Sequence, residues 1–182
     1  MGANDGASGA AVLLELTRSL DVSKLSHRVW FVFLDGEANA GVPGWEGMLG
    51  SRAFSRRHHP AAVVYLDKVG AADAVFPKSP DATALLQTQL WEWAKKLGFS
   101  QQFSLQTGPD IEDAPTIFLK SGIAASEIVQ PDFAADHTTL DQCDQLSTDT
   151  LERVGILLEH YLENDSFSVI APSLRKKPTT TP

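Results

Sequence analysis

Cysteine is almost missing from this sequence of 182 residues, because Cys143 is the only one. A single thiol cannot close an intramolecular disulfide or supply a thiolate cage for a metal. Basic residues are also few, with 15 Lys and Arg against 23 Asp and Glu, and the formal net charge is −8. Nucleic acids and anionic membranes attract basic surfaces, and long apolar runs are missing too. We therefore expect neither nucleic acid nor a membrane as a partner.

The sequence also lacks a recognisable export signal. Met1 is followed at once by the turn-rich run GANDGASG at residues 2–9, without the basic segment, apolar core and cleavage site of a signal peptide. Because a domain rarely opens on a tight glycine loop, we expect that the beginning was removed or is not encoded here. The sequence leaves the compartment open.

Three runs rich in β-branched or other apolar residues predict strands. They span residues 27–35 (HRVWFVFLD), 61–68 (AAVVYLDK) and 123–129 (IAASEIV). The first two are apolar without alternation, which is typical of strands buried on both faces of a parallel sheet.

Apolar residues at helical spacing predict helices between and around these strands. A buried helix follows Ser8, which is a candidate cap, and Ser79-Pro80-Asp81 is expected to open a helix that stops at Gly98. Two more helices are predicted over residues 45–57 and 147–163.

The alternation of strands and helices predicts an α/β fold, a three-layer sandwich with a mostly parallel central sheet flanked by helices. We expect one domain over residues 1–171 and a flexible tail over 172–182, which is polar, basic and rich in proline. Right-handed crossovers would place the loops after the three strands along one edge, where sites in open sheets usually form.

Four acidic or imidazole residues lie in loops or at strand ends, namely Asp5, Glu37, Asp67 and His137. Carboxylate and imidazole ligands suit zinc, and a nearby carboxylate that is not a ligand can deprotonate zinc-bound water. Each residue also has a plain structural explanation, such as a turn, a strand end or a solvated surface. Their spacing alone does not decide between the two.

Short sequence segments around these residues carry more information than the spacing of the four residues. Five segments, in order, resemble the zinc aminopeptidase and glutaminyl-cyclase superfamily, which includes bacterial leucyl aminopeptidase-like enzymes. They are GANDGASG at 2–9, FLDGE at 33–37 with LGSR at 49–52, YLDKVG at 65–70, FLKSGI at 118–123, and DHTTLD at 136–141. Order and intervals agree from Gly2 to about Asn164.

The resemblance implies a role for each candidate residue. Asp5 matches a carboxylate that binds zinc and bridges two ions in the peptidases, and Asp67 matches the ligand of a second zinc. His137 matches an imidazole ligand, and Glu37 matches the general acid–base residue. One or two zinc ions and a peptide or small aminoacyl substrate are therefore implied.

This sequence departs from the family pattern at several positions. Ala38 stands where a second acid usually ligates zinc, and a histidine ligand on a strand upstream of residue 2 is not in the chain. Asp136 stands where many cyclase-like relatives carry tryptophan. With Asp113 and Trp45, Asp136 is a candidate for the substrate pocket, although Trp45 also fits a packing role.

Three functions follow as alternatives. The first is a zinc-dependent, aminopeptidase-like hydrolase acting on peptide N-termini, with Glu37 as general base. The second is a glutaminyl-peptide cyclotransferase. The third is a catalytically degenerate scaffold or binding protein, which Ala38 and the missing histidine support.

The missing upstream strands have a structural consequence as well. The resemblance implies a sheet that is incomplete at the N-terminus, so strand 27–35 or its neighbour would expose an unpaired edge. We expect the chain either to pair with a second copy as a homo-oligomer or to rearrange that edge.

Overall fold

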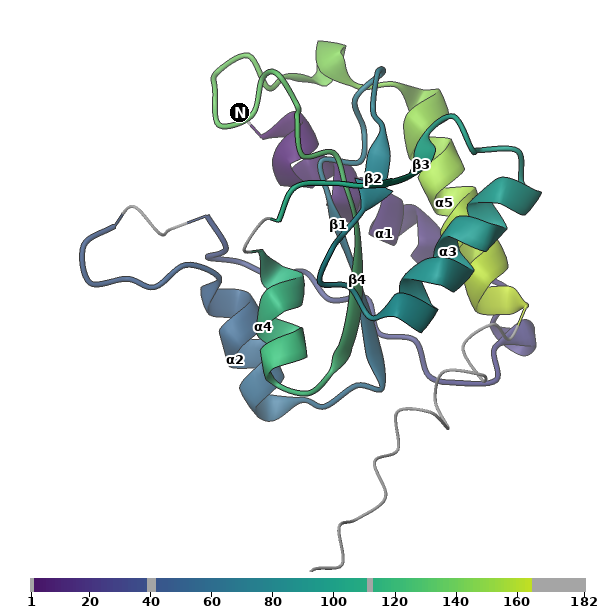
Figure 1. Ribbon diagram of the computed structural model, residues 1–182, viewed down its shortest axis with the longest axis horizontal. Helices are drawn as coiled ribbons and strands as arrows, with labels where there is room; N and C mark the ends of the chain where they lie inside the picture. Colours follow the sequence, from purple (N-terminus) through teal and green to yellow (C-terminus); the bar gives the residue numbers. More distant parts are fainter. Residues whose placement is uncertain (1, 39–41, 111–112, 165–182) are drawn as a thin grey trace, which may run out of the picture.

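The computed structural model describes residues 2–38, 42–110 and 113–164 and has the expected α/β organisation (Figure 1). Its helices and helical turns are η1 (Ala3–Ser8), α1 (Gly9–Ser19), η2 (Val22–Lys24), α2 (Leu49–Arg57), α3 (Ala84–Lys96), α4 (Ala114–Lys120), η3 (Cys143–Gln145) and α5 (Thr148–Glu163). Its strands are β1 (Ala62–Asp67), β2 (Phe76–Lys78), β3 (Phe103–Thr107) and β4 (Ala124–Val129).

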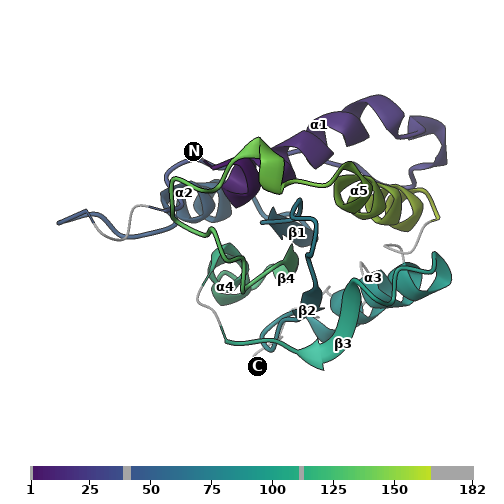
Figure 2. The same ribbon diagram turned by 90° about the horizontal axis from the view of Figure 1, so that it is seen from above.

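The strands form two parallel pairs. β1 pairs with β4 in a register that sets Asp67 beside Val129, and β2 pairs with β3 through Phe76 and Phe103. Every residue of β4 is buried, as expected for a parallel strand covered by helices on both faces. α5 packs against both α1 and α3 on one face of the β1–β4 pair, whereas α4 and α2 lie on the other face, and β2 and β3 lie beyond β4 (Figure 2). The prediction of parallel strands flanked by helices is confirmed.

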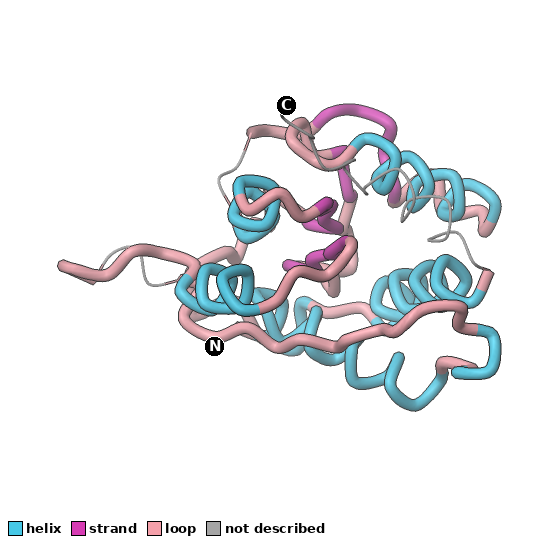
Figure 3. Tube along the Cα trace, turned by 90° about the horizontal axis from the view of Figure 1, so that it is seen from below, coloured by secondary structure: helices cyan, strands magenta, loops and turns pink. Residues whose placement is uncertain are grey.

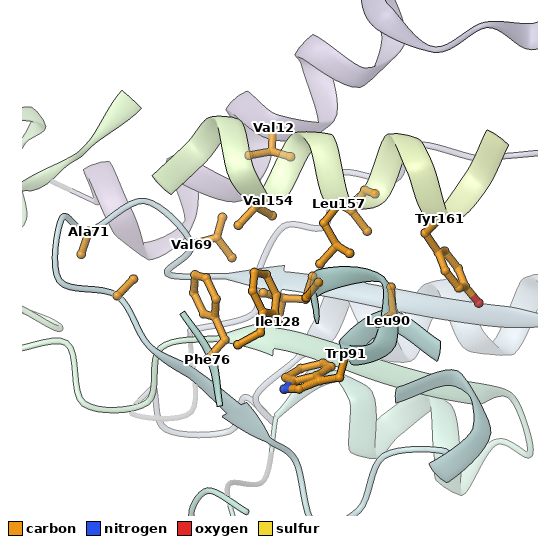
Figure 4. Packing of buried hydrophobic residues seen from close by; sticks show 14 of the residues in the cluster. Val12, Val69, Ala71, Phe76, Leu90, Trp91, Ile128, Val154, Leu157 and Tyr161 are labelled. Carbon is orange, nitrogen blue, oxygen red and sulfur yellow. The ribbon is translucent and has the colours of Figure 1, made fainter. Parts of the chain in front are cut away.

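The main core lies where α5, α3 and α1 meet β4 and the loop after β1. Its members include Val12, Phe76, Ile128, Leu157 and Tyr161, each less than 5% exposed (Figure 4). A smaller cluster joins α4 to β4. Burial of these apolar side chains supplies most of the driving force for folding.

Helix ends agree with the sequence at some positions and differ at others. Ser147 caps α5, and Gly98 follows α3 in the left-handed conformation at φ 83°. However, α3 begins at Ala84 and not at Ser79. The reason lies in Thr83, whose N–H donates to the carbonyl of Ala125 and whose hydroxyl accepts from the Ala125 N–H, so the approach to the helix is tied to β4.

Residues 27–35 correct a prediction, because they belong to no strand in the described part of the chain. The segment is extended loop (Figure 3), and Trp30 and Phe33 are 50% and 53% exposed. A groove of about 1540 Å³ is lined both by this segment and by β1. A strand requires a neighbour within hydrogen-bonding distance, and among the described residues β1 pairs with β4 alone.

The sequence did not predict β2, β3 or α4. The predicted tail at 172–182 lies outside the described residues, as does the end of the predicted domain. Over the described ranges, no helix combines the length and apolarity that crossing a membrane requires.

Candidate metal centre and catalytic groove

The loop that carries Asp5 is held by two buried side chains. The Asp141 carboxylate accepts from the Asn4 N–H at 2.7 Å and from the Asp5 N–H at 3.0 Å, while the Asn4 Oδ1 accepts from the Gly70 N–H at 2.8 Å. Asn4 is fully buried and Asp141 is 2% exposed. This explains the Asn-Asp pair, because Asn4 fixes the loop to the end of β1 and leaves the Asp5 side chain partly exposed.

Two small residues bring α1 against β1. The Ser8 hydroxyl donates to the Asn4 carbonyl and accepts from the Val69 N–H, so it joins η1 to the loop after β1 instead of capping α1 as predicted. A Cβ on Gly9 would lie 2.7 Å from the Leu66 carbonyl oxygen, so only glycine fits this approach.

Asp5, Asp136 and His137 form a cluster that could hold a metal ion. Each offers one ligand atom, and these atoms all lie within 4.8 Å of one another. His137 Nε2 is 3.3 Å from Asp5 Oδ2 and 3.8 Å from Asp136 Oδ1. His137 has a left-handed backbone at φ 54°, which is uncommon for residues other than glycine. Two carboxylates and one imidazole are a donor set that suits zinc.

An orphaned atom supports this fit. Asp136 Oδ1 is buried and has no hydrogen-bond partner. Buried polar atoms are normally satisfied, and an unsatisfied one calls for an explanation such as an ion. The residues present therefore fit a zinc ion with three protein ligands and an open position.

Asp67 lies outside this cluster and is paired with a lysine. Lys68 Nζ is 3.4 Å from Asp67 Oδ2 and 3.1 Å from Asp136 Oδ2. Burial raises the pKa of Asp67 to about 7, Lys68 opposes the rise, and the Asp113 and Asp5 charges add to it. Burial likewise raises the pKa of Asp5, against the influence of Lys68.

Glu37 is held at the start of α2. Its carboxylate accepts from the Ser51 N–H at 2.9 Å and from the Ser51 hydroxyl at 2.6 Å. A Cβ on Gly50 would lie 2.5 Å from the Asp35 carbonyl oxygen and 2.8 Å from Glu37 Oε1, so the LGSR segment is built to receive this glutamate. Glu37, Asp5 and Asp67 line the same groove, together with Ala38.

The other two candidates for the substrate pocket, Asp113 and Trp45, do not belong to the metal-binding cluster. Asp113 caps α4, accepting from the Ala114 N–H at 2.6 Å, and its charge contributes to the raised pKa values of Asp67 and Tyr65. Trp45 is 57% exposed and is not among the residues that line the groove.

Sequence reasoning missed three residues that position the site, Asp141, Lys68 and Ser51. All three lie in the segments that carry the family resemblance, but only the fold shows that they contact Asp5, Asp136 and Glu37. A hydrogen bond between residues 136 positions apart leaves no local pattern.

A carboxylate–imidazole cluster beside a groove that holds a separate glutamate, on a parallel α/β fold, is typical of metal-dependent hydrolases. The comparison with family models agrees, and the chain belongs to Peptidase family M28, whose model matches residues 1–162.

Solved structures with this fold include both peptidases and cyclases. A leucine aminopeptidase precursor from Bacteroides thetaiotaomicron is 29% identical with a TM-score of 0.82, over 90% of this chain and 62% of that one. A glutaminyl cyclase from the same organism, bound to N-acetylhistamine, is 28% identical with a TM-score of 0.82, over 90% and 63%. A Zn-dependent exopeptidase from Parabacteroides distasonis, 20% identical with a TM-score of 0.69 over 90% and 63%, shares the fold.

This chain therefore spans less than two thirds of the length of these structures. No curated protein matches it.

Proposed function

We propose that this chain carries the catalytic residues of a zinc-dependent, aminopeptidase-like hydrolase that removes residues from peptide N-termini. One observation supports this most strongly. Glu37 lines the same groove as Asp5, is held by both hydrogen-bond donors of Ser51, and stays outside the ligand cluster. A carboxylate that is fixed near a metal but not bound to it can serve as a base.

In this proposal Asp5 and His137 hold the zinc, which when bound polarises a carbonyl and acidifies water. Glu37 takes a proton from the attacking water and passes it to the leaving amine. Ser51 keeps the carboxylate in one orientation, which lowers the cost of positioning it during the reaction. The part of the groove lined by Asp5, Glu37 and Asp67 would take the N-terminal residue of a peptide or small aminoacyl substrate.

Glutaminyl cyclisation is the second candidate, because the Bacteroides cyclase matches this chain as closely as the aminopeptidase precursor does. In that reaction the α-amine of an N-terminal glutamine attacks the side-chain amide of the same residue and ammonia leaves. Glu37 would move the proton from the attacking amine to the leaving nitrogen.

The experiment measures free amino acid and ammonia released from aminoacyl and glutaminyl peptides by the zinc-loaded chain. We expect Glu37→Gln to lower kcat by about 10²–10⁴-fold while zinc content stays unchanged, since the amide keeps the contacts with Ser51 but cannot accept the proton. Glu152→Gln, on the exposed side of α5, is the matched control and should leave kcat unchanged.

Amino acid release selects the peptidase, and ammonia release selects the cyclase. A zinc-loaded chain that turns over neither substrate would contradict both and favour the scaffold alternative. A chain that binds no zinc would contradict both enzyme functions directly.

A further inference from the structure

We propose that Asp136 is the third protein ligand of a single zinc ion and that the Lys68 ammonium takes the place of a second cation beside Asp67. The inference rests on the zinc of the proposed function and concerns its ligands and number. Asp5 and His137 alone would give zinc two protein ligands, fewer than the three of most catalytic zinc sites. The side chain of Ala38, which lines the same groove, has no atom that could bind a metal.

The two carboxylate oxygens of Asp136 have different surroundings. Oδ2 accepts a hydrogen bond from Lys68 Nζ at 3.1 Å. Oδ1 is buried without a hydrogen-bond partner and lies 3.8 Å from His137 Nε2. Carboxylates that bind a metal are usually hydrogen-bonded as well, and in Asp136 the bond from Lys68 to Oδ2 leaves Oδ1 available for an ion.

The backbone fixes this arrangement. The Asp136 N–H donates to the Phe133 carbonyl, and Phe133 and Ala135 are both buried. These contacts fix the loop that carries Asp136 and His137. The Asp141 carboxylate, a few residues further on, holds the Asp5 N–H. One loop thus supplies two ligands and positions the third.

Lys68 argues for one ion instead of two. Its ammonium lies between Asp67 and Asp136, at 3.4 Å and 3.1 Å, where it balances the charge of Asp67. Among the described residues, Asp67 does not belong to the group whose ligand atoms converge within 4.8 Å of one another, so the cation beside it is the Lys68 ammonium. The Asp67 carboxylate is thereby assigned to Lys68, and only the Asp5–Asp136–His137 cluster is left for zinc.

Calorimetric titration of the metal-free full chain with zinc gives stoichiometry and Kd, and Co²⁺ absorption reports the ligand set. We expect one zinc per chain. Asp136→Asn should weaken zinc binding at least tenfold and change the Co²⁺ spectrum, because the amide can still accept from Lys68 but lacks the charged donor. Asp132→Asn, an exposed acid of the same loop, is the matched control and should change neither.

Circular dichroism of each variant separates ligand loss from unfolding, and Asp136→Glu should restore part of the affinity. Zinc binding by the wild type that Asp136→Asn leaves unchanged overturns the role of Asp136. Two zinc ions in the wild type, or a Lys68→Met variant that does not take up a second ion, overturn the role of Lys68. A wild type that binds zinc through Asp136 but hydrolyses no peptide defeats only the proposed function.

Discussion

At the scale of single residues, Glu127 is a buried acid whose ionisation should make the stability of the fold depend on pH. It lies on β4, is 6% exposed and faces Tyr65 on β1. Burial raises its pKa to about 7; a hydrogen bond from Ser79 and the Lys68 charge oppose the rise, while the Asp113 and Asp67 charges add to it. The protonated form of Glu127 is therefore favoured in the folded chain.

The sign of the pH dependence follows from this shift. The folded pKa is above the unfolded value of 4.5, so the contribution of Glu127 to stability is fully present below pH 4.5 and is lost as pH rises through about 7. Glu127→Gln cannot ionise and should raise the free energy of unfolding at pH 8 by up to about 3 kcal/mol. Urea unfolding at pH 5 and pH 8 measures the difference, and a variant with the same pH slope as the wild type would contradict it.

The sequence identified the chemistry of single residues better than their partners. Asp5, Glu37 and His137 could be identified as candidate site residues because the sequence segments around them resemble those of a known family. That Glu37 rests on Ser51, or that Asp67 faces Lys68, depends on side-chain geometry at the ends of different elements. Asp136 was expected in the substrate pocket, whereas its carboxylate lies with Asp5 and His137.

At the scale of elements, the site depends on how the loop before α5 holds η1. Asp141→Ala would leave the N–H groups of Asn4 and Asp5 without their acceptor, and Asn4 is fully buried. We expect a loss of about 1–3 kcal/mol of stability and a weaker zinc affinity, because an unsatisfied buried donor costs that much and Asp5 loses its support.

Asp144→Ala serves as the control, since Asp144 is an exposed acid close by in the chain. Urea unfolding and zinc titration of both variants measure the effect. Equal zinc affinity for the Asp141 variant and the wild type would show that Asp141 does not support the metal loop.

Elements with strong local signals were predicted and those without were not. β1, β4 and α5 lie within two residues of their expected ranges. Residues 27–35 have a stronger strand pattern than β2, which has three residues and contains Pro77. The pattern reports β propensity only, and a strand forms where a partner is available.

At the scale of the whole molecule, the groove between residues 27–35 and β1 is the feature that the sequence could not locate. Its lining is largely apolar, and Trp30 and Phe33 are about half exposed. Large exposed apolar surfaces on soluble proteins mark sites of association or aggregation. We propose that the chain self-associates through this face.

Sedimentation velocity over a range of concentrations tests this proposal. We expect a concentration-dependent dimer or larger species that Phe33→Glu weakens by placing a charge at the groove. Val22→Glu, at a residue that is 78% exposed and outside the groove, should leave association unchanged. A wild type that sediments as a monomer throughout would contradict the proposal.

The class of fold could be predicted from the alternation of strands and helices, and the family from five short sequence segments spread over most of the chain. The split of the strands into two separate pairs did not follow, because pairing depends on which backbone edges meet in three dimensions.

The central claim is that Asp5 and His137 share a metal ion within reach of Glu37. Diffraction from crystals grown with zinc, measured on both sides of the zinc absorption edge, tests it most directly. We predict one anomalous peak, bounded by Asp5, Asp136 and His137, with the Glu37 carboxylate not bound to the ion. A zinc-saturated crystal with no peak there, or with Glu37 bound to the ion, would show that these residues do not form the zinc site.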